Sequence, residues 1–341
     1  MLVRATKLKK MMDRFDNAIG IDVSKYTLDV HGYCENAHVQ FSNNEQGFKE
    51  LTQWIKKGNP NREVIICFEH TGLYSLPLAV FLADKCLPFC MVGGLEMHRS
   101  LGIKRGKNDK ADAKDISRYA YLRREEINVY KMPSKALLKL RGLLSLRERM
   151  IKQKAGYQTN LKEMKRVFQE KDNPLWFSSQ QKMIKELIKQ VVKIESQMQQ
   201  IIQEDDQLKK LFELATSVKG VGLIVGISFL VYTNAFTSFN NWRSFASYSG
   251  TAPFPHQSGI SIKGKTKTSP LANKKMKGLL SNSANVAIQH NPEIRQYYNR
   301  RIEEGKSKMS TQNIIKNKII ARVFATVNRG TPYVDTYKHA A

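Results

Sequence analysis

The sequence has few cysteines, few acidic residues and no long apolar run, and each shortage excludes a class of protein. Four of its 341 residues are cysteines. Cys86 and Cys90 have a spacing near that of zinc knuckles, but no second Cys or His pair follows at a matching distance, which argues against zinc. The longest apolar run, Leu223 to Tyr232, is too short to cross a bilayer. Because the sequence also has no lipidation motif and no signal peptide, we expect a soluble intracellular protein with reduced thiols.

Acidic residues are strongly outnumbered, with 56 Lys and Arg against 30 Asp and Glu and a formal net charge of +26. Such an excess is typical of proteins that bind DNA or RNA. From Leu214 to Pro292 there is no Asp or Glu at all. We expect this segment to face nucleic acid and to take carboxylates from elsewhere for any metal chemistry. The residues predicted to contact nucleic acid are Lys25, Arg105, Lys107, Lys219, Arg243, Lys263, Lys265, Lys267, Lys274, Lys275 and Lys277.

Changes in composition along the chain predict five segments. They are a basic arm (1–16), an α/β domain (17–131), coiled-coil linker and dimerisation helices (132–213), a mainly helical C-terminal domain (214–332) and a tail (333–341).

The α/β domain is predicted from alternating β-branched runs and helical spacing. Strands are expected around Asp22, Leu28 and Val39, and over 63–69 and 88–92. Helices are expected over 44–57, 71–84 and 108–124, the first capped by Asn43 or Asn44. This alternation predicts a mixed sheet.

Residues 135–212 are rich in Lys, Glu, Gln, Leu and Met, and their apolar residues recur at steps of three and four. The clearer seam, with Asp205 as its one polar interruption, consists of Ile184, Leu187, Val191, Ile194, Met198, Ile201, Leu208 and Phe212. Such a seam predicts a long helix that packs on another helix. Because Asn173-Pro174 separates the two halves, we expect an antiparallel coiled-coil hairpin that also serves self-association.

Several carboxylates stand where two strands and a helix can bring them together. Asp22 interrupts an apolar strand, Glu69 ends another, and Asp109 and Asp112 lie on one face of a predicted helix, where Asp115 continues the spacing. In an open α/β sheet such positions converge on a shared crevice. Four carboxylates can hold two Mg²⁺ ions about 4 Å apart for displacement at phosphorus. The alternatives are an edge-strand Asp22 that faces water, and helix acids that only complement the helix dipole and neighbouring lysines.

Two glycine-containing motifs follow in the C-terminal half. The segment from Ser217 to Leu223 enters an apolar helix, where it either presents backbone N–H groups to a phosphate or simply starts the helix. The segment from Gly250 to Gly259 has the Pro and Gly content of a loop. In it, Ser258 either attacks a phosphodiester or makes a local hydrogen bond in a turn, and His256 is expected to contact phosphate or the turn.

Together these motifs resemble the insertion-sequence transposases of the one-ten family, also called DEDD transposases, which include a pilin-gene invertase. The resemblance covers nearly the whole chain. It rests on Gly20 to Lys25, Phe68 to Gly72, Lys107 to Ala113, Val218 to Gly222, Gly250 to Pro253 and Gln257 to Gly259, in this order and spacing. Asn108 stands where Thr is more usual, and Lys219 replaces a Pro.

The resemblance implies a ribonuclease-H-like domain, similar to the RuvC junction resolvase. Its metal-binding acids would be Asp22, Glu69, Asp109 and Asp112, with two Mg²⁺ ions and Mn²⁺ as a substitute, whereas Asp115 falls outside the motif. It also implies that Ser258 is the nucleophile of a C-terminal transposase domain. The implied partners are donor and target DNA, a non-coding guide (bridge) RNA from the element, and further copies of the chain as dimers joined into a tetramer. The implied location is the cytoplasm of a bacterium, in association with the nucleoid.

Two other functions stay open at this point. A RuvC-like junction nuclease that uses water needs the same acids but no nucleophilic serine. A nucleic-acid-binding protein left from a decayed element needs neither, although the presence of all four acids and of Ser258 argues against decay. The target site is not specified by the sequence, because guide pairing rather than side chains would read it.

Overall fold

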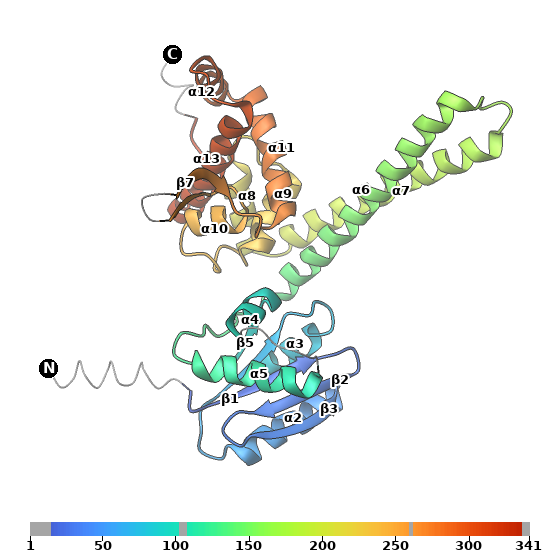
Figure 1. The fold of residues 1–341 in the computed structure, drawn as a ribbon. Coiled ribbons are helices and arrows are strands. Elements are labelled where there is room, and N and C mark those ends of the chain that lie inside the picture. The colour runs from blue at the N-terminus through green and yellow to red at the C-terminus, as the bar shows by residue number, and fades with distance from the viewer. Residues whose placement is uncertain (1–14, 102–107, 259–261, 336–341) are drawn as a thin grey trace. The chain divides into compact units, whose positions relative to one another are not determined.

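The computed structural model describes residues 15–101, 108–258 and 262–335, which form two compact units that divide between Met132 and Pro133 (Figure 1). Within these ranges, no helix combines the length and the apolar character that a membrane crossing requires. Each unit is described by itself below.

The first unit is built on a five-stranded mixed sheet with the strand order β3-β2-β1-β4-β5. The central strand β1 (Asn17–Val23) pairs antiparallel with β2 (Thr27–Gly32), which pairs antiparallel with β3 (Ala37–Ser42). On its other side β1 runs parallel to β4 (Val64–Glu69), and β4 runs parallel to β5 (Phe89–Val92). All five strands match the strands that the sequence predicts, and the predicted mixed α/β sheet is confirmed.

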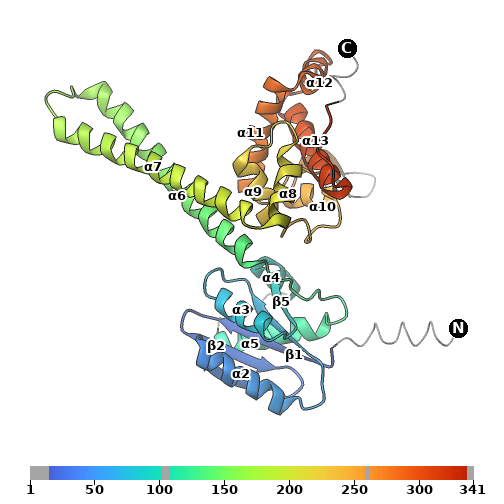
Figure 2. The same cartoon turned by 180° about the vertical axis from the view of Figure 1, so that it is seen from behind.

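Helices cover both faces of this sheet, as the views from the front and from behind show (Figures 1 and 2). Helices α2 (Glu45–Gly58) and α3 (Leu76–Asp84) bury Phe48, Leu51 and Leu78 against one face. Helix α5 (Asp109–Leu122) covers the other face and shares its core with α4 (Gly94–Leu101). The sheet is therefore the middle layer of three, and each strand alternates its side chains between two buried faces.

Two helix predictions in this unit need correction. The helix expected from residue 71 begins only at Leu76, because turns occupy residues 72–75 and Gly72 has a φ of 72°. The sequence analysis did not predict α4, which is only eight residues long and therefore too short for a clear helical period. The predicted cap is confirmed at Asn44, whose Oδ1 accepts a hydrogen bond from the Gly47 N–H at 2.9 Å.

The second unit begins with a hairpin of two long helices, α6 (Lys135–Val167) and α7 (Pro174–Gln203), which lie side by side in Figures 1 and 2. The predicted break at Asn173-Pro174 is confirmed, with Asn173 as the cap of α7. The predicted continuous helix to residue 212 is wrong. Instead α7 ends at Gln203, and Asp205 caps a separate helix α8 (Asp206–Thr216) by accepting a hydrogen bond from Leu208 N–H at 3.0 Å.

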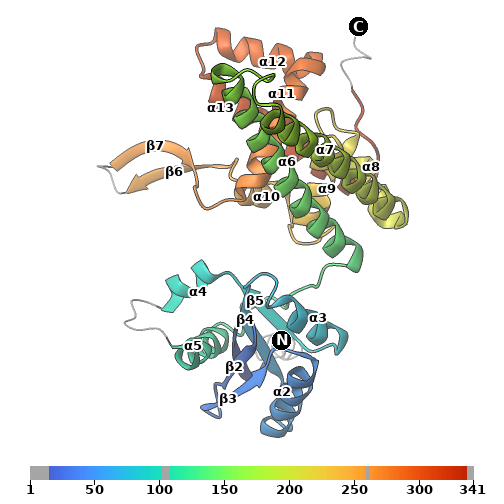
Figure 3. The same cartoon turned by 90° about the vertical axis from the view of Figure 1, so that its right-hand side faces the viewer.

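The rest of the second unit is a helical body with a two-stranded ribbon. Its helices are α9 (Leu223–Tyr232), α10 (Trp242–Tyr248), α11 (Lys274–His290), α12 (Pro292–Glu303) and α13 (Lys308–Arg329). Phe229, Phe245, Leu280, Ile319 and Phe324 are among the residues that form its buried core. The ribbon, β6 (Pro253–Ser258) and β7 (Ile262–Thr268), extends away from these helices (Figure 3).

The ribbon overturns the expectation of a loop from Gly250 to Gly259. Pro253 and Pro255 are compatible with β6 because a two-stranded ribbon leaves one edge of each strand without a ladder partner. Lys263, Lys265 and Lys267 occupy alternate positions of β7. This period-two spacing is a strand signal that the lysine content of the segment obscured.

Candidate active site

Three carboxylates meet at one edge of the first unit. A carboxylate oxygen from each of Asp22, Asp109 and Asp112 lies within 4.8 Å of the others. Asp22 comes from the central strand β1, and the other two come from the first turn of α5, three residues apart and so on one face of the helix. The structure therefore brings together three of the four acids that the resemblance singled out.

Strand alternation and one glycine explain this convergence. Ala18, Gly20 and Asp22 occupy alternate positions of β1 on the face that α5 covers, whereas Ile19 and Ile21 enter the opposite core. At Gly20, a Cβ atom would lie 2.1 Å from Ser117 N and 2.3 Å from Ala113 O. Only glycine permits so close an approach of α5 to β1, and this approach sets its first turn beside Asp22.

The start of α5 is fixed by its cap. The side chain of Asn108 accepts a hydrogen bond from the Lys110 N–H at 3.0 Å, and its carbonyl accepts one from the Asp112 N–H at 2.9 Å. A cap at this position defines where the helix begins, and hence where its first-turn acids lie. Asn108, which stands where threonine is more usual, thus supplies the oxygen that caps α5.

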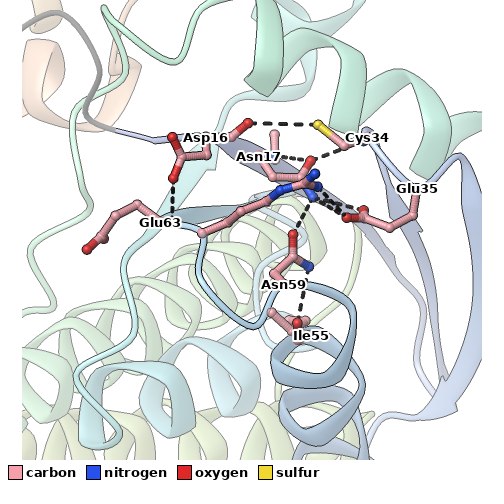
Figure 4. Close-up of polar contacts among 9 residues, drawn as sticks. Asp16, Asn17, Cys34, Glu35, Ile55, Asn59 and Glu63 are labelled. Carbon is pink, nitrogen blue, oxygen red and sulfur yellow. Dashed lines mark hydrogen bonds and ion pairs between the residues drawn. The ribbon is translucent and has the colours of Figure 1, made fainter.

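The opposite end of β1 is anchored by a polar network (Figure 4). Asn17 Nδ2 lies 2.9 and 2.8 Å from the carboxylate oxygens of Glu35 and 2.7 Å from Asn59 Oδ1. The Asp16 carboxylate accepts a hydrogen bond from the Glu63 N–H at 2.9 Å. Because Asn17 is fully buried, these bonds restrict the register of β1, which carries Asp22 five residues further along.

Glu69 lies near this cluster but is not part of the group of three. Ile21 pairs with Phe68 across the parallel strands, so Asp22 and Glu69 occupy the next positions and share the α5 face. The Glu69 carboxylate lies against Gly94 at the start of α4, where a Cβ atom would come 2.2 Å from Oε1. Helix α4, which the sequence analysis did not predict, is therefore the element that the Glu69 carboxylate contacts.

The electrostatics of the cluster fit a divalent cation. Burial, together with the negative charges of Asp109 and Asp112, raises the pKa of Asp22 from 3.8 to about 6. Carboxylate oxygens that repel one another in the free protein gain from a cation placed between them. An all-oxygen donor set suits the hard cations Mg²⁺, Mn²⁺ and Ca²⁺, so the residues present fit a metal of that class.

Asp29 is a buried acid that sequence reasoning missed beside this cluster. It is the cross-strand partner of Asp22 and is 5% exposed. Its two oxygens are engaged by His38 Nε2 at 2.9 Å and Gln40 Nε2 at 3.1 Å, both from β3. Asp29 is thus directed toward β3 and lies outside the three-carboxylate group, as does Asp115.

Ser258 lies in the second unit, as the last residue of β6. It pairs with Ile262, the first residue of β7, so it lies at the end of the ribbon where β6 leads toward β7. His256 lies two positions earlier and pairs with Gly264. The ribbon therefore presents the predicted nucleophile at its extremity.

The predicted nucleic-acid contacts fall into several environments. Lys25 and Arg243 stack over the rings of Tyr26 and Trp242, whereas Lys219, Lys267 and Lys274 are exposed. For Lys263 and Lys265 the structure describes only the backbone, and Arg105 and Lys107 lie outside the described residues.

One of these lysines has an acidic partner that the sequence did not indicate. Lys275 forms an ion pair with Glu148 of α6, which raises the pKa of the lysine and lowers that of the glutamate. The acid-free segment is therefore partly neutralised in space by a helix from outside it. No local pattern could indicate this, because more than a hundred residues separate the two.

Comparisons with known proteins cover both units. Residues 19–168 match the sequence model of DEDD transposases of the IS110 type, and residues 212–299 match that of the IS116/IS110/IS902 transposase family. The pilin gene-inverting proteins of Moraxella bovis and Moraxella lacunata are each 29% identical over 325 residues, which is 92% of this chain and 97% of theirs. An uncharacterised 43.6 kDa protein of insertion element IS110 from Streptomyces coelicolor is 32% identical over 123 residues, covering 36% of this chain and 30% of that protein. Because both halves match models of one family, the chain belongs to the IS110 family of transposases.

Proposed function

We propose that this protein is a metal-dependent DNA recombinase that moves an insertion sequence, with its acids and its serine in separate roles. Asp22, Asp109 and Asp112, with Glu69 beside them, hold Mg²⁺ or Mn²⁺, and Ser258 is the nucleophile. The observation that carries the proposal is the convergence of three carboxylates from β1 and α5. The strand order and the helix against β1 also support a ribonuclease-H-like, RuvC-like fold for this unit.

The chemistry divides between the two units. When bound, the metal supplies positive charge that favours ionised oxygens on phosphorus and on the leaving group. Ser258 forms a bond from its oxygen to phosphorus, the bond from phosphorus to a DNA oxygen breaks, and the proton of the serine passes to the DNA oxygen that leaves. Another DNA hydroxyl then attacks the same phosphorus, the bond from phosphorus to the serine oxygen breaks, and the proton of the attacking hydroxyl passes to the serine, which joins the strands.

The net charge supports nucleic-acid partners, and exposed apolar residues on α7 support self-association. The net charge of +26 suits donor and target DNA together with an element-encoded guide (bridge) RNA. On α7, Ile188 and Val192 are 45% and 59% exposed and lie one helical turn apart. They support the proposal that the hairpin joins chains into dimers, and dimers into tetramers.

A second candidate is a junction nuclease that activates water and leaves Ser258 without a chemical role. The carboxylate cluster favours it, because such a cluster alone suffices for hydrolysis with two metal ions. The two functions differ in one intermediate, because only the recombinase forms a covalent protein–DNA species.

The test uses the full chain with DNA that carries the ends of its element and the RNA that copurifies with it. Products are separated on denaturing gels with and without protease. We expect the wild type to form a protease-sensitive adduct, Asp22→Asn to form neither adduct nor nicks while still binding DNA, and Ser258→Ala to bind without forming the adduct. Clean nicking by Ser258→Ala at the wild-type rate would establish the nuclease instead.

A further inference from the structure

The strongest unassigned feature is a buried lysine in the helical body of the second unit. Lys316 lies on α13 among Ile315, Ile319 and Ile320 and is 4% exposed. Burial lowers its pKa, and the charge of Lys277 lowers it further. Among the described residues no carboxylate forms an ion pair with it. An ammonium group on a side chain that is almost entirely buried is costly without an acidic partner, so its presence points to an anion that joins it.

Lys277 provides a more accessible partner for such an anion. It lies on α11, is half-buried, and donates a hydrogen bond from Nζ to Thr268 Oγ1 at 3.2 Å, which leaves two of its three N–H donors for a ligand. Its side chain passes Gly250, where a Cβ atom would lie 3.6 Å from the lysine Cδ. Neither α11 nor α13 contains an Asp or Glu, so these two helices supply no carboxylate that neutralises the pair.

The two lysines stand where both strands of the ribbon join the helical body. Thr268, bound by Lys277, is the last residue of β7. Thr251, two residues before β6, accepts hydrogen bonds through its carbonyl from Asn313 Nδ2 at 2.8 Å and Asn317 Nδ2 at 3.0 Å, both on α13 beside Lys316. An anion held here would lie at the base of the ribbon whose tip carries Ser258.

We propose that Lys277 and Lys316 together bind one backbone phosphate of the DNA strand that the ribbon presents to Ser258. The proposal rests on the recombinase function above for the identity of the strand. It adds Lys316 to the phosphate-binding residues and gives the buried charge a role. A phosphodiester carries a single negative charge and acceptor oxygens, which suits two ammonium groups with donors to spare.

The test measures binding alone, in the Ser258→Ala background of the full chain, so that failure of the proposed nucleophile does not affect it. The probe is a short fluorescent DNA duplex, titrated at several salt concentrations. We expect Lys316→Met to weaken binding about tenfold and to reduce the slope of log affinity against log salt by about 0.9, as for one lost phosphate contact. Lys308→Met, at an exposed position of the same helix, is the matched control and should retain the parent slope.

Stability separates this role from a structural one. Without DNA, Lys316→Met should melt at or above the temperature of the parent, because it removes a buried unpaired charge. A melting temperature well below that of the parent, or unchanged DNA affinity and salt slope, would overturn the proposal. So would a loss of affinity confined to an RNA duplex of the same sequence.

A second variant tests whether the two lysines share one phosphate. Lys277→Gln should weaken binding by a similar factor, and the double variant should be little weaker than either single one, because the shared contact is already lost. Fully multiplicative losses would mean separate phosphates and would contradict the shared site.

Discussion

Replacing Asp22 with Asn should stabilise the metal-free protein and remove the stabilisation that divalent cations give the wild type. The pKa of Asp22 is raised from 3.8 to about 6 by burial and by the charges of Asp109 and Asp112. At about 1.4 kcal/mol per pH unit, this rise corresponds to about 3 kcal/mol of lost stability once the carboxyl is ionised. Because Asp22 retains some solvent contact, screening reduces the figure, and we expect a gain of about 1–3 kcal/mol from Asp22→Asn.

The direction of the pKa shift fixes the pH dependence. Below the ordinary pKa of 3.8 the carboxyl is protonated in the folded and the unfolded states, and the penalty is absent. As pH rises from 3.8 to about 6 the unfolded state ionises first, so the penalty grows, and above this range it is complete. The advantage of Asp22→Asn over the wild type should therefore be full at neutral pH and shrink as the pH falls toward 4.

Urea unfolding followed by circular dichroism, in EDTA and in Mg²⁺, measures both effects. Mg²⁺ that binds only the folded wild type adds RT ln(1 + [Mg²⁺]/Kd) to its stability, whereas the variant should gain little. Asp84→Asn, at an exposed acid at the end of α3, is the control. If Asp22→Asn is less stable than the wild type in EDTA at neutral pH, or gains as much from Mg²⁺, the reasoning from mutual repulsion is refuted.

Three further predictions concern the surroundings of the site and the charge of the protein. Gly94→Ala should displace the Glu69 carboxylate and reduce metal-dependent DNA cleavage. Gly93→Ala is the control, because a Cβ atom there meets nothing within 4 Å. Equal cleavage rates for the two variants would contradict the placement of Glu69. Gly20→Ala should push α5 away from β1, lower the free energy of unfolding in urea by about 2 kcal/mol or more, and remove the stabilisation by Mg²⁺. A variant with wild-type stability would refute the close approach of α5 to β1. DNA affinity should fall steeply with salt, by about 0.9 in log slope for each neutralised phosphate, and a flat dependence would contradict the polyanion-binding reading of the net charge.

Local patterns were sufficient for the sheet and for most helices of the first unit. Strand alternation placed Asp22 and Glu69 correctly, and Asn44 and Asn108 were readable as boundaries because capping depends on neighbours in sequence. The spacing of Asp109 and Asp112 gave their common helix face for the same reason. The contact between Gly20 and α5 brings these pieces together, and it is visible only in the fold.

The errors arose where a tertiary contact or a second signal outweighed the local one. The apolar spacing continues past the end of α7 and therefore predicted one uninterrupted helix, although Asp205 is a residue type that favours a helix cap. Pro and Gly content concealed β6, and the high lysine content of the following segment concealed β7. The contact of the Glu69 carboxylate with Gly94 and the ion pair of Lys275 with Glu148 each join two elements that are separated in sequence. Residue spacing therefore could not predict either contact.

The central claim, that Ser258 is the nucleophile, is tested most directly by locating the covalent bond. After reaction with element-end DNA and nuclease digestion, trypsin releases a peptide of residues 244–263, which contains Ser258. Mass spectrometry should find this peptide with a nucleotide attached through phosphorus to the Ser258 oxygen, dependent on Mg²⁺ or Mn²⁺ and absent from Asp22→Asn. An adduct on another residue, or DNA cleavage with this peptide unmodified throughout the time course, would contradict the account.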